Sequence, residues 1–420
     1  MKEINQLDLF SGIGGFHLGF ERAGFKVNSY FSEVDKHAIA VYQHQFKDST
    51  YVGSVTDVRG ADLPRIDLIT FGSPCQDFSL AGKRKGMGGE RSSLITEAIR
   101  LVHECRPRVF IWENVKGTFS SNNGADFWAI IQAFANIGGY RLEWQLLNTS
   151  WFLPQNRERI YLVGYLAESK GDWGGVFPIK EKCRETDNRN GGGNQCAQTL
   201  TARYFASTAQ GSYIGERNEI QEVKVGTWRT HKDGQGFREV KGGDCPTIPA
   251  RAREDGSGQP VIKVKSATPT GYDIATEGDA INLTAINSTT RRGRVGRQQA
   301  QTLDTLCEQA VVTPKIIGYS RDAKGKVVDR HLKDEAGTIH TGSGGGGNTD
   351  QFVQDYRIRR LTPIECERLQ GFPDNHTSKG IYEGEVKEMS NTQRYKQCGN
   401  AVTVDVVQAI AEKLHPMFEQ

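Results

Sequence analysis

The sequence has no apolar run near the ~20 residues that a membrane helix needs, and it starts without an apolar signal-peptide segment. Its eight cysteines are scattered, with no Cys-x-x-Cys pair and no zinc-like spacing. Charge is nearly balanced, with 53 Lys and Arg against 50 Asp and Glu, a net charge of +3. We therefore expect a soluble cytoplasmic protein with free thiols and no metal site. Any nucleic-acid binding must come from local basic patches.

Short apolar segments alternate with amphipathic ones over residues 4–165 of the 420-residue chain. The predicted strands are Leu7–Phe10, Val27–Ser32, Leu68–Phe71, Val109–Trp112, Leu142–Leu147 and Ile160–Tyr165. The predicted helices are Phe16–Ala23, Lys36–Gln45, Ser92–Glu104 and Ala125–Ile137. This alternation is typical of an α/β fold with a largely parallel sheet covered on both faces. Such sheets bind ligands at the carboxyl ends of their strands.

The composition changes near Ala167 and stays rich in Gly, Ser, Thr, Asn and Arg to about Gln354. A helical pattern returns at Arg359–Gly371 and again at Asn400–Leu414. We predict that residues 390–420 return to complete a first domain of residues 1–165. Residues 166–389 would then form an inserted, irregular β-rich region, with a hinge helix near 359–371.

A short motif with a Thr-Leu or Thr-Ile centre recurs in the inserted region. It occurs at residues 197–202, 245–250, 300–305 and 336–341, with irregular spacing that excludes a solenoid. Two interpretations are open at this point. The copies are either duplicated β-hairpins that enlarge one domain, or separate target-recognition modules in tandem.

A glycine-rich turn follows the first predicted strand, in the run from Asp8 to Phe16. Gly12 and Gly14 allow a tight turn and a close approach of the backbone to a ligand. Glu33 ends the second predicted strand, where an acidic group typically binds a ribose hydroxyl pair. Together they predict a nucleoside cofactor, although a plain strand–helix connection and a solvated carboxylate would look similar.

Cys75 lies in the loop that follows the apolar segment Ile66–Phe71, within Gly-Ser-Pro-Cys-Gln. A cysteine at a strand end can present its sulfur to a ligand, whereas a structural cysteine is more common inside a strand. A free thiol is mostly protonated at neutral pH and needs activation. The basic, Gly-rich stretch that follows, residues 82–91, resembles a mobile lid and contains Lys83, Arg84, Lys85 and Arg91.

Glu113 follows the strand Val109–Trp112, so its carboxyl is expected at the same sheet edge as Cys75. A carboxyl there can share a proton with a ring nitrogen. Arg157 and Arg159 alternate just before the strand Ile160–Tyr165, which places both guanidinium groups on one face. We expect them to bind a phosphate, a carbonyl oxygen or the Glu113 carboxylate.

Four arginines without an acid mark one stretch of the inserted region, residues 289–297. Arginine contacts phosphates and reads guanine through two hydrogen bonds. Arg291, Arg292, Arg294 and Arg297 are therefore candidates for DNA contact, with a solvated basic loop as the alternative.

Taken in order, these motifs resemble the bacterial and phage cytosine-5 DNA methyltransferases. The resemblance covers about residues 5–165 and 355–412. It includes Gln155-x-Arg157-x-Arg159, the Thr-Leu/Ile centres and Gly399-Asn400-Ala401-Val402. It implies a Rossmann-like S-adenosylmethionine-dependent domain with an inserted target-recognition domain. One departure is Gly53-Ser54-Val55, where the family often has Gly-Asp-Ile with the Asp on the adenine amino group.

The resemblance also implies a role for individual residues. The catalytic set would be Cys75, Glu113, Arg157 and Arg159. The cofactor would contact Phe10, Gly12, Gly14, Glu33, Val34, Ser54, Pro74, Asn400 and Val402. DNA would contact Ser79, Lys83, Arg84, Lys85, Arg91 and Thr338, together with the four arginines of 289–297.

The activity implied is transfer of a methyl group from S-adenosylmethionine to C5 of a flipped cytosine in double-stranded DNA, through a covalent bond from Cys75 to C6. A monomer without an obligatory protein partner is expected, and a companion restriction nuclease is an open question. Three alternatives stand beside this one: the same chemistry on transfer RNA, a non-catalytic DNA-binding relative, and an NAD-type dehydrogenase. The last leaves Cys75 and the two arginines unexplained.

Overall fold

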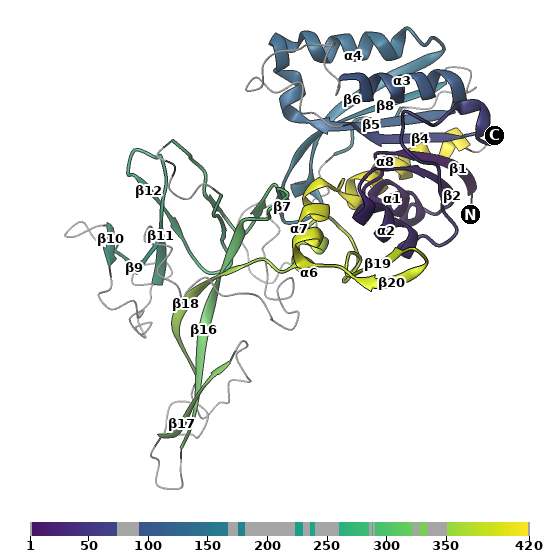
Figure 1. Ribbon diagram of the computed structural model, residues 1–420. Helices are drawn as coiled ribbons and strands as arrows, with labels where there is room; N and C mark the ends of the chain where they lie inside the picture. Colours follow the sequence, from purple (N-terminus) through teal and green to yellow (C-terminus); the bar gives the residue numbers. More distant parts are fainter. Residues whose placement is uncertain are drawn as a thin grey trace. The chain divides into compact units, whose positions relative to one another are not determined.

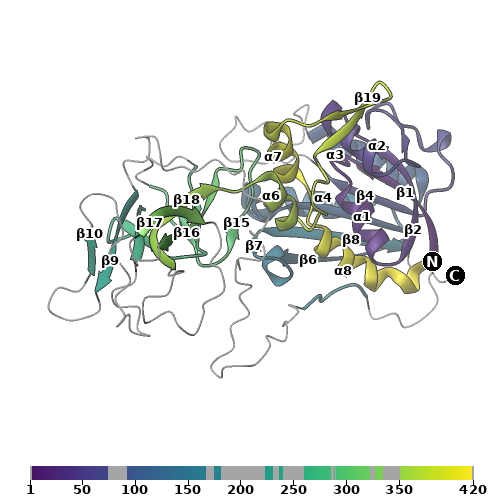
Figure 2. The same ribbon diagram turned by 90° about the horizontal axis from the view of Figure 1, so that it is seen from below.

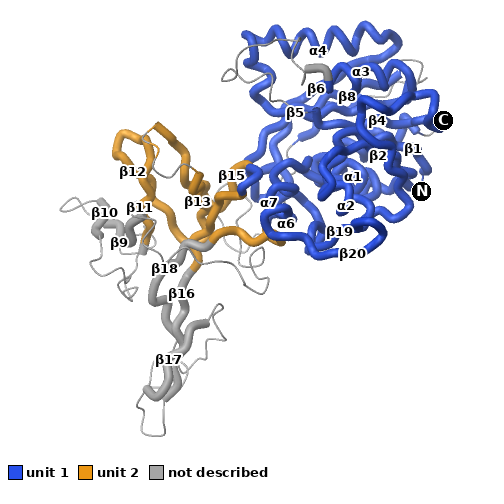
Figure 3. The backbone as a smooth tube through the Cα atoms, viewed as in Figure 1, with its two compact units in different colours: residues 1–196, 304–306, 366–420 blue, residues 197–303, 307–365 orange. Residues whose placement is uncertain are grey.

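The computed structural model describes residues 2–73, 92–166, 175–180, 223–229, 236–239, 260–284, 288, 290–321, 327–333 and 351–418. The chain divides into two compact units, which Figure 3 colours separately. Unit 1 comprises residues 1–196, 304–306 and 366–420, and unit 2 comprises residues 197–303 and 307–365. Residues 366–389 thus belong to unit 1, whereas the sequence analysis placed them in the inserted region.

Unit 1 is built on a seven-stranded sheet with the strand order β3-β2-β1-β4-β5-β8-β6. Its strands are β1 (Lys2–Leu9), β2 (Phe25–Ser32), β3 (Thr50–Tyr51), β4 (Leu68–Gly72), β5 (Val109–Val115), β6 (Tyr140–Asn148) and β8 (Glu158–Leu166). The pairs from β3 to β5 are parallel, and β8 runs antiparallel to both β5 and β6. The predicted largely parallel α/β sheet is confirmed, with β8 as a reversed strand.

Helices cover both faces of this sheet, as Figure 1 shows. They are α1 (Gly15–Arg22), α2 (Lys36–Gln45), α3 (Ser92–Cys105), α4 (Ala125–Ala135) and α8 (Val404–Leu414). Alternate residues of β5 divide between the two layers because side chains in a strand point to opposite faces. Val109 and Ile111 pack with α1 and α8, and Phe110 and Trp112 pack with α3 and α4.

The end of the chain closes unit 1 beside its beginning. Both termini lie together in Figure 1 and in the view from below in Figure 2. Lys2 Nζ donates to His415 O at 2.8 Å, and His415 Nε2 donates to Ala23 O at 2.6 Å. The predicted return of the C-terminal segment to the first domain is therefore present in unit 1.

The helical prediction for residues 400–414 holds only in part. Helix α7 (Asn391–Asn400) ends where the prediction begins, residues 401–403 are extended, and α8 follows. The carbonyls of Gly399 and Ala401 accept hydrogen bonds from the Arg157 guanidinium. At this break the Arg157 side chain therefore donates the hydrogen bonds that backbone amides would donate in a continuous helix.

The helical prediction for residues 359–371 is also too long. Arg359 and Arg360 end strand β18 (Gln351–Arg360) because they pair with Val311 and Ala310 of β16 (Gln309–Arg321), and α6 covers Pro363–Leu369. The hairpin of β19 (Lys379–Tyr382) and β20 (Glu385–Glu388) was not predicted. It packs against α2, because a Cβ on Gly380 would lie 2.8 Å from Ala40 Cβ.

Unit 2 is a β structure in the residues that the model describes. One sheet has the order β10-β9-β11-β12, and in another β16 pairs with β13, β17 and β18. The remaining strands of unit 2 are β9 (Val223–Arg229), β10 (Gly236–Glu239), β11 (Pro260–Lys265), β12 (Tyr272–Ala275), β13 (Ala280–Asn282), β14 (Val295–Gly296), β15 (Ala300–Gln301) and β17 (Val327–Lys333). The short strand β7 (Gln155–Asn156) belongs to unit 1. None of the described helices in either unit is long and apolar enough to span a membrane.

Candidate active site

The turn between β1 and α1 takes left-handed backbone conformations, which favour glycine. Phe10, Gly12 and Gly14 have φ values of 53°, 54° and 83°, all in the left-handed region. A Cβ on Gly14 would lie 2.2 Å from the ring of Phe46, so a side chain there would also clash. On Gly15 a Cβ would lie 2.6 Å from Val402 Cγ2, which places the predicted cofactor residue Val402 against this turn.

Glu33 is held at the end of β2 by backbone amides. Its Oε2 accepts from Gly12 N at 2.9 Å, and its Oε1 accepts from Val34 N at 2.7 Å and Asp35 N at 3.0 Å. These three backbone amides fix the carboxylate beside the glycine turn. Val34 follows with 75% of its surface exposed, an unusual position for an apolar side chain. The two residues together offer a carboxylate and an apolar surface at one strand end.

Ser54 lies just beyond the third strand end at the same edge. Ser32 Oγ donates to Gly53 O at 2.8 Å, and Tyr51 OH donates to Glu33 O at 3.0 Å, so the ends of β2 and β3 are joined. The Ser54 hydroxyl lies 2.9 Å from Thr56 Oγ1. The predicted cofactor residues Gly12, Glu33 and Ser54 thus come from three adjacent strand ends.

The glycine turn rests on a buried polar network that the sequence analysis did not identify. Asp8 accepts from Thr70 Oγ1 at 2.8 Å and from Tyr42 OH at 3.4 Å, and Tyr42 OH also contacts Ser29 Oγ at 2.7 Å. Burial raises the pKa of Asp8 well above its usual range, with a smaller contribution from Glu33. The available sequence signal was a carboxylate inside the otherwise apolar predicted strand Leu7–Phe10.

His376 supports the same turn from the C-terminal part of unit 1. Its Nε2 donates to Ile13 O at 2.9 Å, and its own carbonyl accepts from Gln45 Nε2 at 2.6 Å. Burial, with smaller contributions from Arg22 and His44, lowers the pKa of His376 to about 4, against the opposing effect of the bond to Ile13. His376 is therefore neutral in the folded protein near neutral pH.

Stability is expected to fall on mild acidification because of this histidine. The folded pKa of about 4 lies below the ordinary value of 6.5, so the contribution is complete above pH 6.5 and is lost as the pH falls toward 4. From pH 7 to pH 5 the loss in unfolding free energy is about 2 kcal/mol. Urea denaturation of the wild type and of His376→Gln at both pH values checks this. The loss of unfolding free energy between pH 7 and pH 5 should be about 2 kcal/mol smaller in the variant. Equal losses in the two proteins would contradict it.

Glu113 and Arg159 meet on one face of the sheet. Glu113 pairs with Tyr161, and Val115 pairs with Arg159, so the two charged side chains are diagonal neighbours on β5 and β8. Arg159 Nε lies 3.1 Å from Glu113 Oε1, a charge contact without hydrogen-bond alignment, because Oε1 has no hydrogen-bond partner among the described residues. The Glu113 residue is only 8% exposed. A buried carboxyl oxygen thus stays available to a donor.

The chain leaves β4 toward Pro74 and Cys75 directly beside this carboxyl. Gly72 pairs with Glu113, and a Cβ on Gly72 would lie 3.2 Å from Glu113 Oε2. The next residue, Ser73, is buried and accepts from Trp112 Nε1 at 3.0 Å. Pro74 and Cys75 themselves lie outside the described residues. The strand end that precedes them is fixed next to Glu113, and the position of Cys75 at the same edge stays a prediction.

Arg157 takes a different position from Arg159. It is 3% exposed, and its guanidinium donates to Gly399 O at 3.3 Å and to Ala401 O at 2.9 Å. Burial lowers the pKa of Arg157 to about 9, with a further contribution from Arg159. Arg157 therefore binds the segment that contains the predicted cofactor residues Asn400 and Val402.

Comparisons with known proteins identify the family of the chain. The family model described as C-5 cytosine-specific DNA methylase matches residues 4–415. The chain belongs to this family. An orphan methyltransferase of Bacillus phage SPR, M.SPRI, is 29% identical over 446 residues, covering 99% of this chain and 98% of the relative. The type II methyltransferase M.Bsp6I of Bacillus sp. (strain RFL6) is 26% identical over 415 residues, covering 97% of each.

A solved structure has the same fold. The methyltransferase EhMeth of Entamoeba histolytica matches with a TM-score of 0.52 and 14% identity, covering 99% of this chain and 98% of its own. The family match makes the protein an enzyme, a DNA methyltransferase with an α/β fold. The dehydrogenase alternative is thereby excluded.

The predicted DNA contacts of this methylase are only partly within the described residues. Ser79, Lys83, Arg84, Lys85, Arg91 and Thr338 lie outside them. The four arginines of 289–297 do not form one exposed cluster. The prediction is wrong for Arg294, which is fully buried; its carbonyl accepts from Asn282 N at 2.8 Å, next to β13.

The other three arginines bind neighbouring groups in unit 2. Arg297 Nη1 lies 2.8 Å from the buried carboxylate of Asp279. Arg291 donates to Thr284 O at 3.2 Å, and Arg292 donates to Ala267 O at 3.0 Å. Arg292 and Arg297 are exposed, so they keep the exposure that DNA contact requires.

Proposed function

We propose that this methylase transfers a methyl group from S-adenosylmethionine to C5 of a cytosine flipped out of double-stranded DNA, with Cys75 as the nucleophile. One observation supports this most directly. Glu113 is buried, its Oε1 has no hydrogen-bond partner among the described residues, and it lies beside the strand end that leads to Cys75. A cysteine and a carboxyl group at one strand edge are what covalent activation of a pyrimidine ring needs.

The strand ends fit S-adenosylmethionine. Gly12 has a left-handed backbone conformation and open space where a Cβ would lie, which suits close approach of a ligand to the backbone. Glu33 retains acceptor capacity for a ribose hydroxyl pair, and the exposed Val34 offers an apolar contact for the base. We assign Ser54 to the adenine end, and Pro74, Asn400 and Val402 to the remaining wall. When bound, S-adenosylmethionine supplies the methyl group as a carbon electrophile.

The chain's own residues act on the cytosine. The Cys75 thiolate adds to C6, and the Glu113 carboxyl proton stabilises the charge that develops at ring N3. Arg159 contacts Glu113 and binds the base through its O2 oxygen. After methylation, loss of the C5 proton and departure of the thiolate restore the aromatic ring. Arg157 acts as a positioning residue through the carbonyls of Gly399 and Ala401.

We assign recognition of the target sequence to unit 2. Its described part is formed by β strands, and the exposed Arg292 and Arg297 can contact phosphates there. The Thr-Leu/Ile centre at 300–305 is within the described residues, and the other three copies are not. We expect the enzyme to act as a monomer.

Bisulfite sequencing tests this function. Unmethylated plasmid is incubated with the purified full chain and S-adenosylmethionine, and then sequenced. Methylation at one motif is expected if the repeats enlarge a single reader, and at several unrelated motifs if they are separate modules. An unmethylated plasmid would overturn the proposal for DNA. The same assay on transfer RNA would then separate an RNA-directed enzyme from a silent binding protein.

A further inference from the structure

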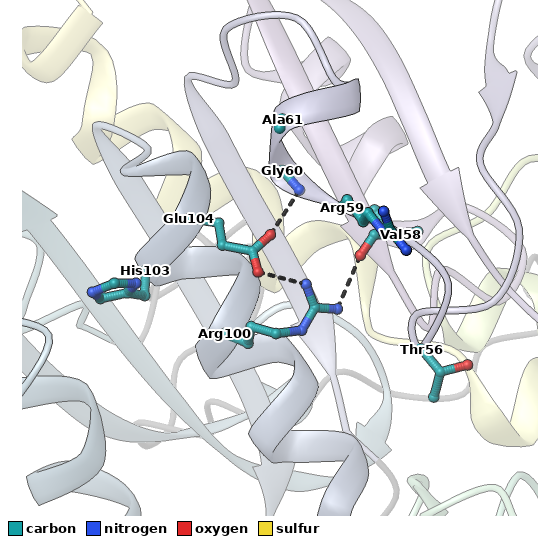
Figure 4. Close-up of a pocket in the computed structure, with 8 residues that line it drawn as sticks. All are labelled: Thr56, Val58, Arg59, Gly60, Ala61, Arg100, His103 and Glu104. Atoms are coloured by element: carbon teal, nitrogen blue, oxygen red, sulfur yellow. Dashed lines mark hydrogen bonds and ion pairs between the residues drawn. The ribbon is translucent and has the colours of Figure 1, made fainter.

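A surface pocket of about 710 Å³ lies in unit 1 between α3 and the short 3-10 helix η1 (Gly60–Asp62), as Figure 4 shows. Its lining residues are Thr56, Val58, Arg59, Gly60, Ala61, Arg100, His103 and Glu104. Neither Glu33 nor Glu113 lines it. One lining residue, Thr56, has its hydroxyl 2.9 Å from that of Ser54, a residue of the proposed cofactor site. The pocket therefore lies beside the turn of residues 54–60, which begins at the proposed cofactor residue Ser54.

Arg100 crosses from α3 to this turn. Its Nη2 donates to Val58 O at 2.9 Å and to Val55 O at 3.3 Å, as drawn in part in Figure 4. The same guanidinium donates from Nε to Glu97 Oε2 and from Nη1 to Glu104 Oε1, both at 2.8 Å. Two carboxylates on α3 thus orient the guanidinium toward two carbonyls of the turn.

Glu104 fastens the other end of the turn. Its Oε2 accepts from Gly60 N at 2.7 Å while its Oε1 binds Arg100, so one carboxylate joins the helix to η1. A Cβ on Gly60 would lie 2.8 Å from Glu104 Cβ, which shows how closely the two segments approach. Residues 55–60 are therefore attached to α3 at three backbone positions: Val55, Val58 and Gly60.

The same turn begins at the cofactor edge. Ser54 O accepts from Asp57 N at 2.9 Å and from Val58 N at 3.2 Å, so Ser54 and Val58 belong to one closed turn. Gly53, just before it, is bound to Ser32 beside the Glu33 carboxylate. A ligand whose ribose meets Glu33 would extend over Ser54, because the ends of neighbouring parallel strands lie side by side.

We propose that Arg100 is a positioning residue for S-adenosylmethionine, because it fixes the turn of residues 54–60 against α3 before the cofactor binds. This inference rests on the proposed function, which places the adenine end of the cofactor at Ser54. A turn that is already ordered binds its ligand without the entropy cost of ordering it. Without the guanidinium, the carbonyls of Val55 and Val58 lose these partners and the turn gains freedom.

Calorimetric titration with S-adenosylhomocysteine tests this on the full chain. We expect Kd to rise about tenfold in Arg100→Ala, the effect of losing charge-assisted bonds, and about threefold in Arg100→Lys, which retains the charge. KM for S-adenosylmethionine should rise in parallel, while kcat at saturating cofactor stays within about twofold of wild type.

Arg106→Ala is the matched control. Arg106 also binds two turn carbonyls, those of Ile137 at 3.1 Å and Gly138 at 2.8 Å, but its turn precedes β6 and carries none of the proposed cofactor residues. Its Kd should stay within about twofold of wild type. An unchanged Kd in folded Arg100→Ala, or an equal rise in Arg106→Ala, would overturn the inference.

Two further measurements distinguish a failure of this inference from misfolding of a variant and from failure of the proposed function. Thermal denaturation shows whether each variant folds, and Arg100→Lys carries the test if Arg100→Ala does not. Wild-type protein that binds no S-adenosylhomocysteine would instead refute the proposed function, before any variant is compared.

Discussion

Replacement of Glu113 by glutamine is expected to lower kcat for methyl transfer by about 10²–10⁴-fold, the range for loss of a general acid. Glutamine has nearly the same shape but cannot deliver a carboxyl proton to a ring nitrogen. Glu113 is 8% exposed and faces Arg159 Nε at 3.1 Å, so water has little access to replace the lost proton donor. Cofactor binding should change little, because Glu33 and the glycine turn hold separate contacts.

Initial rates with labelled S-adenosylmethionine measure this effect, and calorimetry with S-adenosylhomocysteine confirms an intact cofactor site. Glu158→Gln is the matched control, since Glu158 lies on the same strand as Arg159 but its side chain is 38% exposed and paired with Lys116. We expect that control to stay within about threefold of wild type, as for other exposed pairs. Cys75→Ser supplies the inactive reference. A Glu113→Gln rate close to wild type would remove Glu113 from the chemistry.

Replacement of Glu367 by alanine is expected to lower the free energy of unfolding by about 3–5 kcal/mol, the usual cost of breaking a buried ion pair. Glu367 is fully buried and accepts from Arg394 Nη2 at 2.9 Å, Asn375 N at 2.8 Å and Thr377 N at 2.9 Å. The Thr377 hydroxyl donates to the same carboxylate. Loss of the carboxylate leaves the Arg394 charge and two backbone amides without their acceptor.

Urea denaturation measures this loss, with Asp374→Asn as control. Asp374 pairs with Arg368 in the same segment, but its side chain is 45% exposed, so its loss should cost at most about 1 kcal/mol. A Glu367→Ala variant as stable as Asp374→Asn would show that the buried carboxylate is not needed for folding.

Periodicity alone gave most of the sheet and its helices correctly. Helix α2 matches the predicted residues 36–45, and β4 and β5 were found because each is a buried apolar run. Because the carboxyl ends of parallel strands lie at one edge of a sheet, the sequence alone then predicted that Gly12, Glu33 and Glu113 lie at the same edge. The sequence was sufficient to predict these positions because they depend only on the local hydrophobic pattern and on the parallel arrangement of the strands.

Features set by distant partners were not predictable. The break between α7 and α8 depends on Arg157, more than 240 residues earlier in the chain, binding two carbonyls there. Arg294 looked like an exposed DNA contact because its neighbours are basic, yet its side chain is buried. The role of Arg100 had no sequence signal either, since an amphipathic helix commonly contains such an arginine. Tertiary contacts decide each of these cases.

The hydrogen bonds from Arg157 to the carbonyls of Gly399 and Ala401 also determine when the fold of unit 1 can be completed during synthesis of the chain. A ribosome releases the glycine turn, Glu33 and Glu113 long before Gly399 and Ala401 exist, and α1 packs on α8 only when the final helix has emerged. Nascent and prematurely terminated chains therefore lack both the segment that Arg157 binds and the helix that packs on α1. Two separately expressed fragments divided within residues 197–303 would have to reunite through this contact before either showed activity.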